Sequence, residues 1–249
     1  MKRLSSLLPV LLSALALAAG TPEAKVFSSH LMVDQEVAVS SRITGVVETI
    51  HVERGAAVTR GQPLATLELR EFDQDVEQAK AQMALARAEL DRAEALTTGG
   101  VGSRADLDTK RAAYAVAVAA WEKAKAVRDY AVIRAPFAGV VTDKSARIGQ
   151  KVVDVQNIPL FKITAMEPLL ARIYVPEKDL VSLHRGAAVE VVPVSFPKAK
   201  TTGVIDFISP TIDAASGTVQ VVIKVRRDPA QPILRPGLAV EVRFKAPAP

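Results

Sequence analysis

The side chains that could carry out chemistry are few and lie far apart in this sequence of 249 residues. There is no cysteine, which excludes thiolate catalysis, disulfides and cysteine metal sites. The three histidines, His30, His51 and His184, share no motif, and no glycine-rich phosphate loop, nucleophile elbow or HExxH pattern occurs. We therefore predict no catalytic residue, no cofactor site and no metal site.

Closely spaced carboxylates are the remaining candidates for acid–base chemistry. Asp73 with Asp75, and Asp106 with Asp108, each lie at the start of a predicted helix. The helix dipole stabilises negative charge there, so a structural role is the simpler interpretation. An enzyme whose scattered carboxylates meet in the fold stays as an alternative. The four methionines form no cluster, and nothing favours a metal cargo over an organic one.

The N-terminus has the pattern of a secretory signal peptide. Lys2 and Arg3 precede an apolar run from Leu4 to Leu17, and small residues favour cleavage before Ala19. The run is shorter than the ~20 residues of a spanning helix, so we expect a cleaved signal over residues 1–18, with an uncleaved anchor as the alternative. The formal charge of +5 is spread along the chain. Without a basic stripe and interleaved aromatics, nucleic-acid binding is not expected.

The elements that must position any functional group begin with an interrupted repeat. The first copy contains Gly45-Val46-Val47, Gly55, Val58, Pro63-Leu64 and Leu67; the second contains Gly139-Val140-Val141, Gly149, Val152, Pro159-Leu160 and Ile163. Each copy indicates short strands joined by tight turns. Because neither copy can bury its apolar face alone, residues 36–70 and 131–164 are expected to form one discontinuous β-sandwich. We assign structural turns to Gly45, Gly55, Gly61, Gly139, Gly149 and Gly237.

Residues 71–130, between the two copies, favour an antiparallel helical hairpin. Helix formers fill 71–96 and about 104–128, and Thr97 to Gly102 separate them. Apolar residues three and four apart predict a coiled-coil seam, to which Lys110 is an exception. Ser103 is a predicted N-cap, with Asp106 completing an imperfect capping box. The hairpin could fold back into a bundle, but no third long helix is present, so we expect it to project.

Residues 165–245 predict a small antiparallel β-barrel. Five Val- and Ile-rich runs are separated by Gly and Pro turns, and a short helix starts near Pro176. The predicted fold class is mainly β with α: a discontinuous lipoyl-like sandwich interrupted by a coiled-coil hairpin and followed by a barrel.

This order of motifs resembles the periplasmic adaptor, or membrane fusion, proteins of tripartite efflux systems, chiefly those that serve RND pumps (the HlyD-like family). The resemblance covers about residues 36–244. It is carried by residues 45–47 and 55–64, by Arg134-Ala135-Pro136-Phe137-Ala138-Gly139-Val140-Val141, by Ile208-Ser209-Pro210-Thr211-Ile212-Asp213 and by Leu234-Arg235-Pro236-Gly237.

The resemblance implies a function as an adaptor between an inner-membrane RND transporter and a TolC-like outer-membrane channel. It also implies a periplasmic location at the inner membrane and a ring of several copies, with six as the expected number. Adaptors that meet TolC-like channels share Arg, Leu four residues later and Ser seven after that, which Arg92, Leu96 and Ser103 match. They would contact the channel from the hairpin tip. Solvated-helix, packing and capping roles are the structural alternative.

Three other interpretations stay open or are set aside. An adaptor of an ABC exporter has the same plan, and so does a periplasmic binding module that uses the hairpin. Biotinyl and lipoyl carriers resemble the sandwich, but they modify a lysine at the junction of the halves, whereas Lys144 and Lys151 lie inside the second half. The family's membrane-proximal domain is expected to be absent or reduced to a strand, because only residues 21–35 precede the first repeat. The sequence does not identify the cargo.

Overall fold

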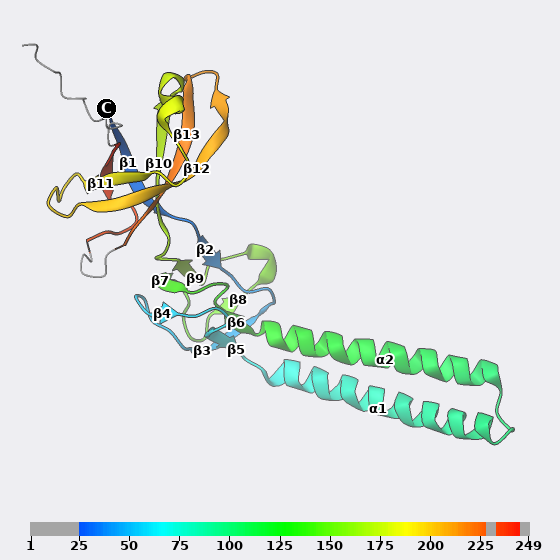
Figure 1. Ribbon diagram of the computed structural model, residues 1–249. Helices are drawn as coiled ribbons and strands as arrows, with labels where there is room; N and C mark the ends of the chain where they lie inside the picture. The colour runs from blue at the N-terminus through cyan, green and yellow to red at the C-terminus, as the bar shows by residue number, and fades with distance from the viewer. Residues whose placement is uncertain (1–24, 228–232, 245–249) are drawn as a thin grey trace, which may run out of the picture.

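The computed structural model describes residues 25–227 and 233–244. The predicted signal peptide therefore lies outside the described residues. The molecule is elongated, with a β-barrel at one end, a sandwich in the middle and a helical hairpin projecting from the sandwich (Figure 1). This arrangement confirms the fold class that the sequence predicts.

The sandwich consists of two four-stranded sheets. One has the order β2 (Glu36–Val39), β9 (Phe161–Thr164), β7 (Gly139–Lys144) and β4 (Ala57–Val58). The other has the order β6 (Val132–Arg134), β5 (Pro63–Leu67), β3 (Gly45–Ile50) and β8 (Lys151–Val152). Each sheet thus contains strands from both copies of the repeat, so neither copy could form its sheet alone.

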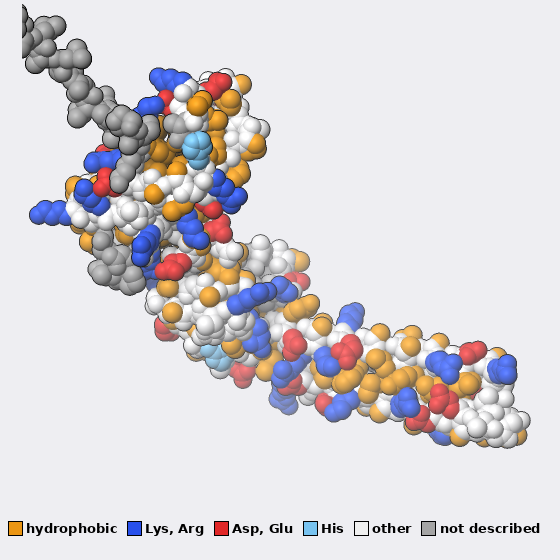
Figure 2. All heavy atoms as spheres, in the orientation of Figure 1, with side chains coloured by type: hydrophobic (Ala, Val, Ile, Leu, Met, Phe, Trp, Pro, Cys, Tyr) orange, Lys and Arg blue, Asp and Glu red, His pale blue; other side chains and the backbone are white. Residues whose placement is uncertain are grey.

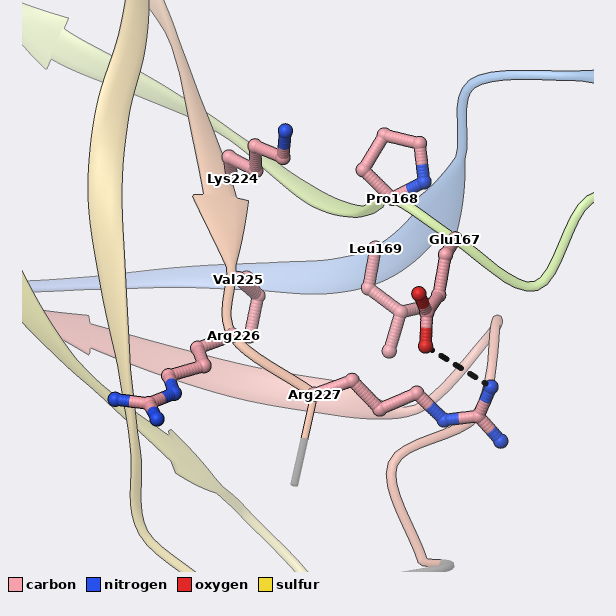
Figure 3. A pocket seen from close by; sticks show the side chains of 7 residues that line it. All are labelled: Glu167, Pro168, Leu169, Lys224, Val225, Arg226 and Arg227. Carbon is pink, nitrogen blue, oxygen red and sulfur yellow. Dashed lines mark ion pairs between the residues drawn. The ribbon is translucent and has the colours of Figure 1, made fainter. Parts of the chain in front are cut away.

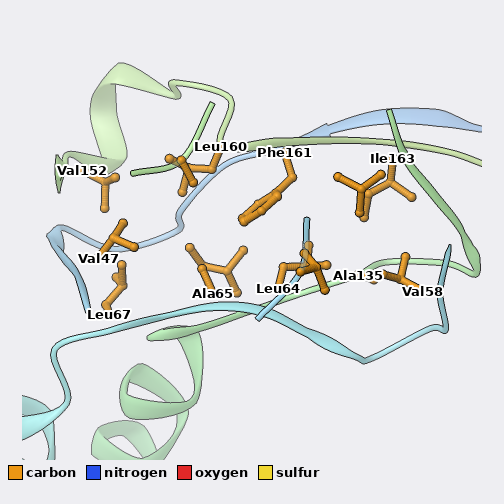
Figure 4. Close-up of a cluster of buried hydrophobic side chains, with 14 of the residues drawn as sticks. Val47, Val58, Leu64, Ala65, Leu67, Ala135, Val152, Leu160, Phe161 and Ile163 are labelled. Atoms are coloured by element: carbon orange, nitrogen blue, oxygen red, sulfur yellow. The ribbon is translucent and has the colours of Figure 1, made fainter. Parts of the chain in front are cut away.

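The core of the sandwich brings equivalent residues of the two copies together. Leu64 and its counterpart Leu160 are fully buried, and so are Leu67 and Ile163. These side chains point toward one another around Phe161 (Figure 4). The residues that recur in the two copies are therefore core residues. Their burial is the main driving force for packing the two halves together.

The glycines of the repeat fall into two structural types. Gly55, Gly61 and Gly149 have φ of 88°, 82° and 78°, and Gly237 has 88°, which is the left-handed region where a side chain is strained. Gly45 and Gly139 were expected in turns, but they begin strands β3 and β7. A Cβ at Gly139 would lie 2.6 Å from the carbonyl oxygen of Thr164. Close packing of backbones, and not turn geometry, is the reason for glycine there.

The hairpin consists of α1 (Arg70–Thr98) and α2 (Arg104–Tyr130). Ser103 is the N-cap residue of α2, but its hydroxyl makes no capping hydrogen bond, so the predicted capping box with Asp106 is not formed. Within the described ranges, no helix is both long enough and apolar enough to cross a membrane.

The barrel is closed and has six strands. Their order is β1 (Val26–Val33), β10 (Leu169–Pro176), β13 (Thr218–Val225), β12 (Thr201–Asp213), β11 (Ala188–Pro193) and β14 (Ala239–Arg243). The predicted short helix is a 3-10 helix, η2 (Glu177–Ser182), and a second one, η1 (Asp154–Gln156), lies in the sandwich. Strand β1, which precedes the sandwich in the chain, was not assigned to the barrel from the sequence. It pairs with both β10 and β14, which places Leu31 in the barrel core.

Candidate functional site

The hairpin is a long stalk with little burial. Within its two helices only Leu90 and Ala93 are buried, and both lie toward the distal end of α1. The space-filling view shows a hydrophobic stripe along the stalk with charged side chains on either side (Figure 2). This pattern is typical of a two-helix seam.

Ion pairs between the helices supplement the seam. Lys110 Nζ lies 3.0 Å from Glu89 Oε2, and Arg128 Nε lies 2.9 Å from Asp73 Oδ1. The hydrogen bond from Lys110 lowers the pKa of the Glu89 carboxyl, and the same bond raises the pKa of the Lys110 ammonium. Lys110, the exception in the predicted seam, therefore contributes to pairing by charge where its neighbours contribute by packing.

The tip turn is fixed by backbone hydrogen bonds that converge on one carbonyl. The amides of Val101 and Gly102 both donate to the carbonyl of Leu96, at 3.0 Å each. A Cβ on Gly102 would lie 2.7 Å from the amide nitrogen of Thr97, so a side chain at this position would require the turn to shift. The hydroxyl of Thr97 donates to the carbonyl of Ala93 at 2.8 Å. The turn therefore has one defined geometry.

The structure brings the three predicted contact residues to this end of the stalk. Leu96, in the last turn of α1, is 55% exposed, and Ser103 is exposed at the start of α2. Arg92 Nε donates to the carbonyl of Ala88 at 3.2 Å, which keeps the exposed guanidinium against its own helix. Val101, which sequence reasoning did not select, is 83% exposed and adds a second apolar side chain. In the sequence, only its position after Gly99-Gly100 could have indicated that Val101 is exposed in the turn.

Aromatic residues of α2 also lie along the stalk. The ammonium of Lys125 lies 4.1 Å from the ring centroid of Trp121, and the guanidinium of Arg87 lies 5.4 Å from that of Tyr114. Such cation–π contacts hold long basic side chains over apolar surface. The indole Nε1 of Trp121 is buried without a hydrogen-bond partner among the described residues.

The side chains with potential for chemistry are dispersed over the sandwich and the barrel. His51 Nε2 is 2.8 Å from Thr66 Oγ1 on the sandwich, whereas His30 belongs to β1 and His184 follows η2 in the barrel region. Lys144 forms an ion pair of 3.0 Å with Glu53. In the part of the chain that the structure describes, no three His, Asp or Glu side chains could together hold a metal ion.

A shallow hollow of about 390 Å³ lies beside the barrel at the end of β13. Lys224, Arg226 and Arg227 line it together with Glu167, whose carboxylate lies 3.8 Å from the guanidinium of Arg227. Figure 3 shows Arg227 turned toward Glu167 and Arg226 turned away from it. This ion pair ties the end of β13 to the segment that leads from the sandwich into β10.

Comparisons with known proteins agree with this architecture. A family model described as the CzcB-like, barrel-sandwich hybrid domain matches residues 35–164, more than half of the chain, and the CusB-like, beta-barrel domain matches residues 171–248.

Similar proteins occur among curated sequences. The chain is 27% identical over 227 residues to the multidrug resistance protein MdtA of Photorhabdus laumondii, covering 83% of this chain and 56% of the relative. It is 28% identical over 214 residues to the macrolide export protein MacA of Yersinia pestis, covering 74% and 58%. The chain thus spans little more than half the length of these relatives.

Solved structures share the fold. A MacA–MexA chimera that carries the hairpin domain of Pseudomonas aeruginosa MexA superposes with a TM-score of 0.77 at 22% identity, covering 90% of this chain and 79% of the chimera. The membrane fusion protein Spr0693 of Streptococcus pneumoniae R6 gives 0.71 at 22% identity, covering 90% and 100%.

A split sandwich that carries a helical hairpin and continues into a six-stranded barrel is the fold that this chain shares with Spr0693, which is described as a membrane fusion protein. The chain belongs to the family that has the CzcB-like, barrel-sandwich hybrid domain, followed here by a CusB-like, beta-barrel domain. The resemblance inferred from the sequence is therefore confirmed.

Proposed function

We propose that this chain is a periplasmic adaptor subunit of a tripartite efflux pump. Residues 71–130 would reach a TolC-like channel in the outer membrane, and the barrel, residues 165–245 with β1, would face an RND transporter in the inner membrane. A cleaved signal peptide would deliver the chain to the periplasm, and several copies would assemble into a ring. The work is mechanical coupling and sealing, with no covalent chemistry.

One observation carries this proposal. The stalk ends in a hydrogen-bonded turn that leaves the side chains of Leu96 and Val101 exposed, and the exposed Arg92 lies one helical turn before Leu96 on α1. Soluble proteins rarely gather exposed apolar side chains at the far end of a projecting element unless a partner covers them. MdtA and MacA, by their names, serve multidrug resistance and macrolide export, which supports export as the process. Neither name states a transporter class, so an RND transporter as the partner, with an ABC exporter as the alternative, stays a prediction.

The first experiment is affinity purification of the tagged chain from crosslinked cells, followed by mass spectrometry. Recovery of an inner-membrane RND transporter with an outer-membrane channel is the expected result. Recovery of an ABC transporter would replace the transporter class. Recovery of soluble periplasmic proteins alone would contradict the adaptor function and leave the hairpin as a binding module.

Substitutions at the tip locate the channel contact. We expect Leu96→Asp and Arg92→Asp to abolish crosslinking to the channel and to restore drug susceptibility, because each places negative charge in the contact. Leu85→Asp is the matched control, since Leu85 is also exposed on α1, at 58%, but lies away from the tip. Equal behaviour of Leu96→Asp and Leu85→Asp would contradict the tip assignment.

A further inference from the structure

The two sheets of the sandwich both end, on one side, in an unpaired strand. Strands β2 and β6 are the edge strands there, and a groove of about 530 Å³ lies between them. The lining comes from β2 and the residues after it (Val37 to Ser40, and Arg42), from β6 and the residues after it (Val132 to Pro136), and from Asp129 and Tyr130 at the end of α2. In the register set by Gly45 and Gly139, Ala38 is the counterpart of Val132. The groove is thus built from the same segment of both copies of the repeat.

Hydrogen-bond register shows which backbone groups face this groove. The amide of Ala165 donates to the carbonyl of Gln35 at 2.9 Å, and Val37 and Val39 lie opposite Ile163 and Phe161 of β9. Because backbone groups alternate sides along a strand, the N–H and C=O of Ala38 point away from β9, toward the free edge. Across the described residues, no hydrogen bond engages these two groups.

The same alternation applies to β6. The amide of Leu67 donates to the carbonyl of Ala131, and the amide of Ala135 donates to that of Gln62, both at 2.9 Å. The backbone groups of Val132 and Arg134 therefore face the groove. Two rows of unpaired donors and acceptors are a template for an additional strand.

Natural edge strands are commonly blocked by proline, lysine or a bulge. Strand β2 contains no proline and no lysine, and its pairing with β9 shows no register shift. The guanidinium of Arg134 donates to the carbonyl of Gly61 at 3.0 Å and so is turned toward that loop. Proline, lysine and a bulge are therefore absent from β2, whereas β6 pairs with β5 through a register shift, so β2 is the more open of the two edges.

The walls of the groove define the chemistry of its occupant. The floor is apolar, because Ile133 and Ala135 are buried and Val39 packs partly against the core. The exposed guanidinium of Arg42 lies 5.4 Å from the ring centroid of Tyr130, at the hairpin side of the groove. Among described residues neither Arg42 nor Arg134 forms an ion pair, and Asp129 is the one acid in the lining. An occupant with apolar side chains on one face and a carboxylate would complement this surface.

We propose that this groove docks an extended acidic segment of a partner protein, which adds as a strand to β2 through the backbone of Ala38. Main-chain hydrogen bonds would supply affinity, while Arg42 would select a carboxylate and the floor would accept apolar side chains. This site is separate from the hairpin tip and does not depend on the proposed function. It gives the sandwich, otherwise a support for the hairpin, a recognition role of its own.

A model peptide tests the proposal with the purified mature chain. The probe is a blocked hexapeptide of alternating valine and glutamate with a fluorescent label, measured by polarisation. We expect saturable binding, a loss of about tenfold or more when lysine replaces glutamate, and no binding of the backbone N-methylated peptide, which cannot donate hydrogen bonds. Absence of saturable binding, or equal binding of the lysine peptide, would overturn the proposal.

Two variants place the binding at β2. Ala38→Pro removes the N–H that faces the groove without touching the pairs that Val37 and Val39 make with β9, and it should weaken binding about tenfold or more. Ala38→Val keeps the N–H and is the matched control. Arg42→Glu should reverse the preference from the glutamate peptide to the lysine peptide. This reversal tests the binding site independently of Ala38→Pro, which could disturb the fold. An unchanged preference for the glutamate peptide would show that the peptide does not bind beside Arg42.

Self-association is the remaining outcome. If the chain forms dimers by light scattering and the glutamate peptide dissociates them, the occupant is a second copy of this chain and the assignment to a partner protein is wrong. If the chain binds the peptide as a monomer, the partner assignment stands.

Discussion

The hairpin and the sandwich are joined end to end, yet they are stabilised in different ways. The sandwich has fifteen buried residues in one cluster, drawn from both copies of the repeat, whereas the two helices, of 29 and 27 residues, contain two buried residues. The hairpin depends instead on helix propensity, a narrow seam and ion pairs such as Glu89–Lys110. An element with so little burial keeps most of its surface available for partners.

The contrast also concerns what each region tolerates. A close-packed core is sensitive to the loss of a single methylene group, whereas exposed helix positions accept most substitutions within about 0.5 kcal/mol. Four substitutions test this difference, from the largest expected effect to the smallest.

Phe161→Ala should destabilise the sandwich most. The ring is 1% exposed in the middle of the core, and truncation of a buried phenylalanine typically costs about 3–5 kcal/mol. Urea unfolding followed by circular dichroism measures the change. Val155→Ala, at an exposed position of the same domain, is the control and should lie within about 0.5 kcal/mol of the parent. If Phe161→Ala lowered the free energy of unfolding by less than Leu90→Ala does, the expected difference between sandwich and hairpin would be wrong.

Leu90→Ala should have a smaller and local effect. Leu90 is 3% exposed but packs in a seam two helices wide, so we expect about 2 kcal/mol, the low end for such truncations. Hydrogen exchange should accelerate in the distal halves of α1 and α2 and stay unchanged in the sandwich. Leu85→Ala on the exposed side of α1 is the control. Faster exchange in the sandwich would show that the two regions are not independent.

Gly102→Ala should cost about 1 kcal/mol, at the lower limit of overpacking effects, because an exposed turn can shift to relieve the clash. The added methyl group would meet the amide of Thr97 at 2.7 Å. Hydrogen exchange of the Val101 and Gly102 amides reports the change. Val101→Ala removes a side chain without touching the backbone and should leave these amides protected. Equal exchange in both variants would contradict a fixed turn.

Glu89→Gln should give the smallest effect, one that appears as pH dependence. The Lys110 ammonium holds the pKa of Glu89 below its ordinary value of 4.5. A carboxyl whose pKa is lower in the folded state stabilises the fold above its unfolded pKa, and this contribution disappears as the pH falls through the folded value. Helix protection near the tip should therefore decline below about pH 4.5 in the parent and decline less in the variant.

A double-mutant cycle controls this last measurement. In a Lys110→Met background, Glu89→Gln should have little further effect on the acid dependence, because the partner that lowers the pKa is gone. An undiminished effect would assign the pH dependence to another group.

Much of the architecture could be predicted because it follows local rules. The spacing from Gly45 to Leu67 recurs from Gly139 onward, and this recurrence alone indicates a two-part sandwich. The helix formers between the copies predict the hairpin. Arg92, Leu96 and Ser103 were selected by resemblance, and the structure shows their exposure; their contact with a channel stays a prediction.

Other features depend on distant pairings that a sequence does not display. Strand β1 has polar residues at Ser28 to His30, and its partners β10 and β14 lie far along the chain. The docking groove exists only because β2 and β6 fall at the same side of two sheets. Val101 can contact a partner only because the turn leaves its side chain exposed. Such features are set by sheet order and chain direction, which local periodicity does not encode.

The pairing of β1 with β14 has a consequence for biosynthesis. The barrel can close only after β14, the last described strand, has been made and has paired with β1, the first. As the polypeptide emerges from the N-terminus onward, the hairpin can form first, then the sandwich around its base, and the barrel last. In the chain, the hairpin lies between the two halves of the sandwich, and the sandwich lies between β1 and the other barrel strands. The sandwich is therefore completed after the hairpin, and the barrel after the sandwich. A truncation within β14 should therefore leave the barrel open while the stalk and sandwich are already folded.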